Sequence, residues 1–270
     1  MLYGDAVGVG GEPVRAVALV TGASSGIGAA LARRLAARGD TVGIIGRRED
    51  KLAAVLADCQ TSSPDSRSWV LDLADLEAAE RWALEAWDEL GPIDVLVNNA
   101  AVPKRRPIQR LTTEEVEGVM AINFFAPARI TLALVPRMLE RGRGAIVNVS
   151  SLGGRAGISH EAAYCASKFA LSGWSEVLAM DLDGTGVKVL LVQPGPIDTD
   201  IWDRPGEDPA PFTGPFEPPE LVADGIIAAL DSDTFEHYLP DLNSVVTYKT
   251  ANVDEWIRNN AAYGRTESRD

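Results

Sequence analysis

The chain has 270 residues, of which 46% are hydrophobic, so it is long and apolar enough to bury the core of one large domain. A formal net charge of −14 disfavours nucleic acid and anionic membrane surfaces as partners, and no apolar run of ~18 residues stands out as a membrane span. Two cysteines and two histidines give no disulfide framework and no zinc-ligand spacing, so we expect no metal site and a cytoplasmic protein.

The chain begins with a short polar segment and then alternates between two kinds of element. Residues 1–13 are rich in glycine and lack the basic-then-apolar layout of a signal peptide, so we expect a loose N-terminal extension. From residue 14 to residue 193, strand-like and helix-like segments alternate. This alternation predicts an α/β fold with a doubly wound parallel sheet, the three-layer Rossmann arrangement, in a single domain over residues 14–270.

A glycine loop joins the first predicted strand to the first predicted helix. The apolar residues 14–20 are followed at once by the run TGASSGIG, and a helix rich in Ala and Arg is expected over about 29–38. Glycines let the backbone approach a pyrophosphate, and the helix N-terminus meets its charge. The spacing Gly-x3-Gly-x-Gly differs from the usual Gly-x-Gly-x-x-Gly, but its position still predicts a dinucleotide site. We assign to the cofactor Gly22, Ser24, Ser25, Gly26, Ile27 and Gly28.

The end of the second predicted strand, 41–46, bears on which dinucleotide is bound. An enzyme that prefers NAD is expected to carry an acidic residue there, which accepts the ribose hydroxyls. Gly46 occupies that place and Arg47 follows, and an arginine can pair with a 2′-phosphate. We therefore expect NADP(H) in preference to NAD(H), with a merely solvated arginine at a helix start as the alternative.

Three side chains further along the chain suggest proton-transfer chemistry. Residues 144–151 are apolar and β-branched, which predicts a buried strand with Ser151 at its carboxyl end, where open α/β sheets bind ligands. Tyr164 and Lys168 are four residues apart in a helix predicted over 161–183, so they share one face. An ammonium group stabilises phenolate, and bringing a Tyr pKa near neutrality takes about 3 units, or about 4 kcal/mol. Taken alone, Ser151 could make only a turn hydrogen bond, and such Tyr–Lys pairs also arise on solvated helices.

Together these motifs resemble the short-chain dehydrogenase/reductase family of single-domain Rossmann oxidoreductases. Besides the glycine loop, Ser151 and the Tyr164–Lys168 pair, the ordered pieces are Asp72 within LDL, the run NNAA at 98–101, Asn123, and the run PGPIDT at 194–199. They span residues 21–199 in the family's order and spacing, so the set is far more specific than any member of it. One departure is Ala101, where the family usually has glycine, and we expect it to be tolerated.

The resemblance implies a carbonyl–alcohol oxidoreductase with four catalytic residues. Tyr164 would exchange a proton with the substrate oxygen, and Ser151 would hydrogen-bond the same oxygen. Lys168 would lower the pKa of Tyr164 and hold the nicotinamide ribose, and Asn123 would hold a water that links Lys168 to solvent. Without the resemblance, Asn123 would be taken as a polar residue inside a helix. Hydride transfer would belong to the cofactor.

Further cofactor contacts are implied by the same resemblance at the ends of later strands. Asp72, after a strand at about 68–71, would meet the adenine amino group, and Asn98, after a strand at 93–97, would lie beside the adenosine ribose. Asp72 or Asp75 could instead serve only as a helix cap. The loop that ends the strand 187–193 would contact the carboxamide and phosphates. The remaining expected contacts are Leu73, Ala100, Tyr164, Lys168, Pro194, Gly195, Ile197 and Thr199.

Substrate specificity is expected from residues 200–219, where family members place a mobile lid. Trp202 could cover an apolar substrate, with Ser151 and His160 as further contacts, although the aromatic residues of this segment could also only pin a surface loop. A basic cluster lies near the expected mouth of the site and keeps an acidic carrier protein open as a substrate donor, with a solvated loop as the alternative. It consists of Lys104, Arg105, Arg106 and Arg110.

The C-terminal part extends beyond the point where many family members end. After a predicted helix at 219–231 and a strand at 236–240, apolar spacing at Val253, Trp256 and Ile257 predicts an additional helix over about 252–262. This helix could cover the pocket or form a subunit contact. The family usually assembles through the long helices predicted here at 112–141 and 161–183, so we expect a homodimer or homotetramer.

The resulting hypothesis is an NADP(H)-dependent oxidoreductase that interconverts a small-molecule ketone or aldehyde and an alcohol. A 3-oxoacyl thioester reductase is the enzymatic alternative, in which Lys104, Arg105 and Arg106 should matter for thioester substrates. A non-catalytic NAD(P)-binding regulatory protein on the same fold is the alternative from another class. Such a protein would be expected to lack Tyr164 or Lys168, and this chain has both.

Overall fold

Seven parallel strands form one sheet in the computed structural model, which describes residues 15–210 and 212–266. The strand order is β3-β2-β1-β4-β5-β6-β7, so the strand order reverses between β1 and β4. The strands are β1 (Val17–Thr21), β2 (Thr41–Gly46), β3 (Arg67–Val70), β4 (Val95–Asn98), β5 (Gly144–Val149), β6 (Val187–Pro194) and β7 (Glu236–Leu239). The predicted doubly wound parallel sheet is confirmed, and the expected extension over 1–13 lies outside the described residues.

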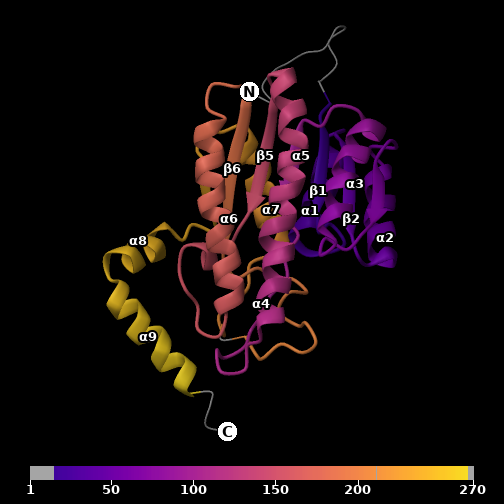
Figure 1. Cartoon of the computed structure of the whole chain (residues 1–270). Coiled ribbons are helices and arrows are strands. Elements are labelled where there is room, and N and C mark those ends of the chain that lie inside the picture. The colour runs from indigo at the N-terminus through magenta and orange to yellow at the C-terminus, as the bar shows by residue number, and fades with distance from the viewer. Residues whose placement is uncertain (1–14, 211, 267–270) are drawn as a thin grey trace.

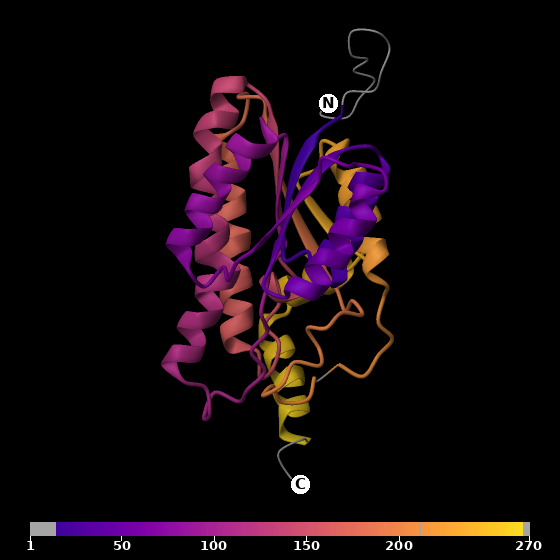
Figure 2. The ribbon, with the colours of Figure 1, turned by 90° about the vertical axis from the view of Figure 1, so that its right-hand side faces the viewer.

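Helices cover both faces of the sheet and complete the three layers (Figures 1 and 2). One face is covered by α1 (Gly26–Ala37), α2 (Glu49–Gln60) and α7 (Pro219–Leu230). The other face is covered by α3 (Leu76–Leu90), α5 (Ala126–Arg141) and α6 (Ala162–Asp181), with α4 (Thr113–Met120) directly before α5 and against α6. In parallel sheets both faces are dry, which explains why the central strands are mostly apolar.

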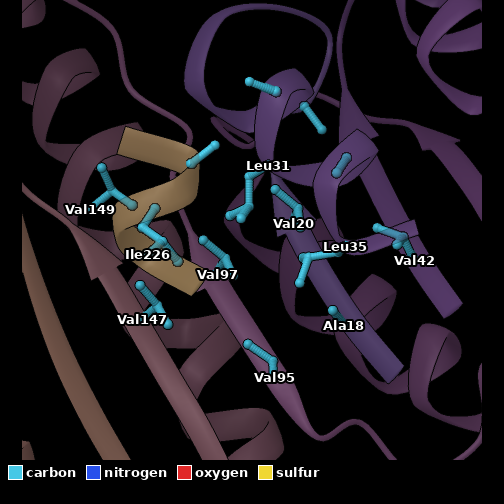
Figure 3. Close-up of a cluster of buried hydrophobic side chains, with 14 of the residues drawn as sticks. Ala18, Val20, Leu31, Leu35, Val42, Val95, Val97, Val147, Val149 and Ile226 are labelled. Carbon is cyan, nitrogen blue, oxygen red and sulfur yellow. The ribbon is translucent and has the colours of Figure 1, made fainter. Parts of the chain in front are cut away.

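The core under α1 and α7 fixes the strands that end at the site. Leu31 and Leu35 of α1 and Ile226 of α7 point down onto buried strand residues such as Val20 and Val97 (Figure 3). Full burial of an aliphatic side chain of this size contributes about 1.5–3 kcal/mol. The carboxyl ends of β1, β4 and β5 are therefore held in rigid relative positions, and the order reversal between β1 and β4 places the expected ligand crevice there.

The helix predicted over 112–141 is interrupted in the middle. It starts at a capping box formed by Thr112 and Glu115, and a π-helical turn, Ala121–Phe125, separates α4 from α5. A π turn adds a residue to the helical repeat and is common at functional sites. An 18-residue window within Thr113–Arg141 has a mean hydropathy of 1.6, although no such run was expected from the sequence, so by length and composition alone this helix could cross a membrane. Core helices of soluble proteins pass the same test. In this fold the stretch packs beside α3 and α6 over the sheet.

The C-terminal part forms two helices where one was predicted. α8 (Asn243–Ala251) is followed by α9 (Val253–Thr266), and Asn252, with φ −134° and ψ 49°, breaks the helix between them. Both extend beyond the carboxyl ends of the strands, beside the lower end of α6 (Figure 1). They follow β7 directly, so this segment is placed near the crevice.

Candidate active site

A cavity of about 980 Å³ opens at the carboxyl ends of the strands. Most of the residues predicted to bind the cofactor or substrate line it: Gly22, Ser24, Ser25, Gly26, Ile27, Arg47, Asp72, Leu73, Ala100, Ser151, Tyr164, Lys168, Pro194, Gly195, Ile197, Thr199 and Trp202. Four predicted residues do not line it, namely Gly28, Asn98, Asn123 and His160. The cavity therefore joins the glycine loop at one end to the Ser151–Tyr164–Lys168 group at the other.

The glycine loop has the shape that a pyrophosphate needs. Gly22 and Gly26 have φ of 68° and 55°, a region that favours glycine, and a Cβ on Gly22 would come within 2.7 Å of the Ala100 Cα. Gly28 lies behind the cavity wall, where a Cβ would meet the Asn99 amide nitrogen at 2.5 Å. Asn99 donates to the Thr21 carbonyl at 2.8 Å, so it holds the loop from behind. The first turn of α1 carries no acidic residue, which leaves its N-terminus free to meet an anion.

Arg48, which the sequence analysis did not single out, lies closer to the glycine loop than Arg47 does. Arg47 lines the cavity but pairs with Asp72 at 3.3 Å. The Arg48 guanidinium donates to Ser24 Oγ at 3.1 Å and also to Ser25 Oγ, and it pairs with Asp200 of the lid. The strand-end position thus provides two guanidinium groups beside the loop, which suits a phosphate ligand.

The two acidic residues after β3, Asp72 and Asp75, have different roles, between which the sequence alone did not decide. Asp75 is the helix cap, since its carboxylate accepts the Ala78 amide at 2.9 Å. Asp72 faces the cavity and holds Arg47, although its other oxygen accepts the Ala74 amide at 3.0 Å. An adenine-binding role therefore remains available to Asp72 alone of the two.

Asn98 lies in a different place from the one expected. It is the last residue of β4, not the first loop residue, and its side chain is buried. Its Nδ2 donates to Asn148 Oδ1 at 2.9 Å and to Thr131 Oγ1 at 3.1 Å. Because this amide links β4 to β5 and α5, the next two loop residues, Asn99 and Ala100, reach the cavity in its place.

Ser151 and Tyr164 meet at the end of β5. Ser151 follows the strand and caps a short 3-10 turn, with its Oγ accepting the Gly153 amide at 3.1 Å. A Cβ on Gly153 would stand 3.3 Å from the Tyr164 ring and 3.5 Å from the Ser151 Oγ, so the missing side chain makes room for both. Burial raises the pKa of Tyr164, although its hydrogen bond with Ser151 acts to lower it.

Lys168 is buried to 1% exposure one turn after Tyr164. Its Nζ donates to the Val149 carbonyl at 2.8 Å and lies 5.8 Å from the centre of the Tyr164 ring. Burial lowers the pKa of Lys168 to about 7, so near neutral pH the amine is only partly charged. Desolvation is the largest effect on both groups, and the expectation that Lys168 lowers the pKa of Tyr164 stays a prediction.

Asn123 lies behind the cavity in the π-helical turn. It is fully buried, and its Nδ2 donates to the Val102 carbonyl at 2.9 Å and to Ser167 Oγ at 3.0 Å. The Val102 amide donates back to Asn123 Oδ1 at 2.8 Å. Ser167 Oγ in turn donates to the Tyr164 carbonyl at 2.7 Å. Asn123 thus ties the loop after β4 to α6 through Val102 and Ser167, and not through Lys168.

Trp202 covers the cavity, and His160 does not. The Trp202 indole donates to the Ile197 carbonyl at 2.7 Å, and its ring centre lies 5.0 Å from that of Phe216. Trp202 therefore stabilises the lid and also lines the cavity. His160 has a left-handed φ of 64° and its carbonyl accepts the Arg106 amide at 2.6 Å. Its neighbours Ser159 and Glu161 line the cavity instead.

The basic cluster after β4 is engaged by the protein, and three of its four side chains are largely buried. Arg105 is 2% exposed, and its guanidinium donates to the carbonyls of Ile201, Trp202 and Asp208 at 3.2, 2.7 and 3.0 Å. Lys104 pairs with Glu207 at 2.9 Å and Glu115 at 3.5 Å, Arg106 with Glu115 at 2.5 Å, and Arg110 with Asp208. All four cations therefore hold the lid or its neighbour α4 in place.

The C-terminal helices form part of the cavity wall. Leu242, Val245, Trp256 and Asn260 line it, and the Trp256 indole donates to the Gly157 carbonyl at 2.9 Å. The apolar periodicity that predicted α9 could have identified Trp256 as a wall residue, but α8 has no such signal. Within residues 15–210 and 212–266, no group of three His, Cys, Asp or Glu side chains could hold a metal ion.

Comparisons with known proteins agree with this geometry. The family model described as short chain dehydrogenase matches residues 16–210. A D-threitol dehydrogenase of Mycolicibacterium smegmatis is 35% identical over 80% of this chain and 86% of its own. A short-chain dehydrogenase structure from Streptomyces avermitilis (32% identity) covers 94% of this chain and 98% of its own, with a TM-score of 0.76. One from Sphingobium yanoikuyae in complex with NADPH (29% identity) covers 92% and 95%, with a TM-score of 0.77. The chain belongs to the short-chain dehydrogenase family and is an NAD(P)-dependent oxidoreductase.

Proposed function

We propose that this protein interconverts a ketone or aldehyde and an alcohol with NADP(H), and that Ser151, Tyr164 and Lys168 carry the proton chemistry. The observation that supports this most directly is the cavity itself. Its wall holds the Ser151–Tyr164 hydrogen bond and the buried Lys168 within one continuous space that also contains the glycine loop. The nicotinamide supplies hydride transfer when it is bound.

The protein side of this chemistry is proton transfer to one oxygen. A Tyr164 hydroxyl with a raised pKa is protonated at neutral pH, which is the form that donates to a carbonyl oxygen during reduction. Ser151 hydrogen-bonds the same oxygen as charge develops on it. Asn123, through Ser167, positions the start of α6 and therefore the Tyr164 ring. Trp202 and the C-terminal helices exclude water from the substrate end.

The preference for NADP(H) rests on charge at the end of β2. Arg48 contacts two serines of the glycine loop, and Arg47 lies beside it. A 2′-phosphate brings about two negative charges, which an arginine fork binds well. The Sphingobium relative was solved with NADPH, which supports the same preference. Arg48 is our first candidate for the phosphate contact, and Arg47 the second, because Asp72 already engages it.

The thioester alternative loses its main support from this geometry. It required Lys104, Arg105 and Arg106 to meet an acidic carrier, and these groups instead bind Glu115, Glu207 and the carbonyls of the lid. We therefore keep a small-molecule carbonyl or alcohol as the proposed substrate.

We also propose a cytoplasmic homo-oligomer, a dimer or tetramer, assembled through α5 and α6. These two helices expose large apolar side chains that the monomer leaves uncovered, namely Phe125 at the start of α5, Leu132, Leu139, Phe169, Val177 and Met180. Such a face is typical of a subunit contact. Sedimentation analysis of the purified protein tests it, and a monomer at micromolar concentration would contradict it.

The proposed chemistry is tested by the change Tyr164→Phe. We expect turnover of a panel of ketones and aldehydes by NADPH to fall by at least about 100-fold, as for loss of a general acid. NADPH binding, measured by protein fluorescence, should change by less than about threefold. Turnover that survives this change would refute the assigned role, and tighter binding of NADH than NADPH to the unchanged protein would refute the cofactor preference.

A further inference from the structure

Glu161 is a buried acidic side chain in the cavity wall that the proposed chemistry does not use. It immediately precedes α6 and is 6% exposed, and it lines the same cavity as Tyr164. Its backbone amide donates to Ile158 and its carbonyl accepts from Cys165. Among the described residues, no hydrogen bond reaches its carboxylate.

The charged groups around Glu161 are already engaged with other partners. Arg105 is near enough to act on it electrostatically, but the Arg105 guanidinium donates to three lid carbonyls. Glu207 faces the same region and is held by Lys104 at 2.9 Å and by the Arg105 amide at 2.6 Å. Burial raises the pKa of Glu161 to about 7, since desolvation outweighs the attraction of Arg105.

A largely buried carboxyl without a hydrogen bond from the protein is costly unless the space that it still faces supplies a partner. Such a group is normally satisfied by protein, solvent or ligand. The side of Glu161 that is open faces the cavity, where the substrate binds beside Tyr164. A substrate group is therefore the natural partner for this carboxyl.

We propose that Glu161 selects substrates that carry a hydroxyl group in addition to the carbonyl or alcohol that reacts. This inference rests on the proposed function, since it assigns the substrate class of the same site. A hydroxyl both donates and accepts, so it pairs with either protonation state of Glu161. An ammonium group would pair only with the ionised form and would be repelled by Arg105. A carboxylate would be repelled by the ionised form of Glu161 and by Glu207.

The test compares hydroxyketones with their deoxy analogues in the presence of NADPH. The hydroxyl is placed one to four carbons from the carbonyl, and the readout is the ratio of kcat/KM for each matched pair. We expect the unchanged protein to prefer at least one hydroxyketone at least tenfold. Glu161→Leu should reduce that ratio at least tenfold, and Glu161→Gln, which can still hydrogen-bond, should keep most of it.

Controls separate recognition from folding. Glu220→Leu, at an exposed position in the first turn of α7, should leave the ratio unchanged. Thermal unfolding at about pH 8 should show Glu161→Leu to be at least as stable as the unchanged protein. Equal losses on both members of each pair, or no hydroxyketone preferred by the unchanged protein, would overturn the inference. If the unchanged protein reduces neither member, the proposed function fails instead.

Discussion

Replacing Arg105 with Ala should release the lid from the rest of the protein. Arg105 extends from the loop after β4, and its guanidinium is the donor for carbonyls at both ends of the segment 201–208. The side chain also stacks on Trp202, with its guanidinium carbon 5.7 Å from the ring centre. No apolar residue could replace these contacts, because the carbonyls need donors.

The size of the effect can be worked out from the three hydrogen bonds. Each bond from a charged donor contributes about 1.5–3 kcal/mol, and the lid carbonyls recover part of this from water once the lid opens. Taking about 1 kcal/mol for each of the three gives about 3 kcal/mol, which is about a 150-fold increase in the equilibrium constant for lid opening. The Arg105→Lys variant keeps the charge but loses the planar guanidinium, so its equilibrium constant for lid opening should lie between those of the unchanged protein and Arg105→Ala.

Hydrogen exchange measures this opening directly and needs no substrate. The Trp202 amide donates to Thr199 just before the lid, the Glu207 amide to Arg204 within it, and the Asp208 amide to Arg105. Their exchange rates therefore report lid opening. They should exchange about 150-fold faster in Arg105→Ala, while amides of β1 and β4 keep their rates. Arg110→Ala is the matched control, because Arg110 is 56% exposed and its single ion pair with Asp208 is worth at most about 1 kcal/mol.

Two results would refute this reasoning. If the lid amides in Arg105→Ala exchange at the rate of the unchanged protein, the guanidinium does not hold the lid. If Arg110→Ala accelerates them equally, a general loss of positive charge is responsible and the buried fork has no special role.

Two further predictions concern the charges at the site. Lys168→Met should stabilise the protein by up to about 5 kcal/mol below about pH 7, and this gain should vanish above about pH 10.5. The reason is that between the folded pKa of about 7 and the unfolded pKa of about 10.5 only the unfolded chain holds the lysine proton. Denaturant unfolding at about pH 6 and about pH 10 checks this, and an equal gain at both pH values would contradict it. Asp200→Asn should tighten NADPH binding several-fold with little effect on NADH binding. In the unchanged protein Arg48 and Lys51 hold the Asp200 carboxylate and lower its pKa to about 2, so the substitution frees both cations for a phosphate. Calorimetric titration measures the two affinities, and unchanged NADPH affinity would count against a phosphate contact at Arg48.

The sequence was sufficient to predict the sheet, because the apolar runs that mark the strands and the glycine and proline residues that end them indicate the same elements. The strand Thr41–Gly46 has the predicted bounds, and the helix after Pro218 ends at Leu230, within one residue of the prediction. Proline and glycine mark these ends whatever the tertiary structure does. The glycine loop and the Tyr164–Lys168 pair were predictable for the same reason, since their geometry is set by spacing along the chain.

Features that depend on contacts between distant segments were not predictable in this way. Arg105 reads as a solvated cation, and only the fold brings its guanidinium to carbonyls about 100 residues away. Asn98 reads as a loop residue, but β4 continues through it and its amide is taken by Asn148. The π-helical turn around Asn123 has no periodicity signal of its own, because it shifts the helix by a single residue.

Burial acts on Tyr164 and Lys168 in a way that their spacing could not reveal. The spacing predicts mutual stabilisation of two charges, whereas the dry cavity wall disfavours both charged forms. The phenol therefore stays protonated and the amine is close to losing its proton, and the amine donates a hydrogen bond to the Val149 carbonyl. The neutral phenol is the form that donates a proton during reduction, although its raised pKa makes it a weaker acid than an ordinary tyrosine. Oxidation requires the phenolate, which this burial disfavours until another positive charge enters the cavity.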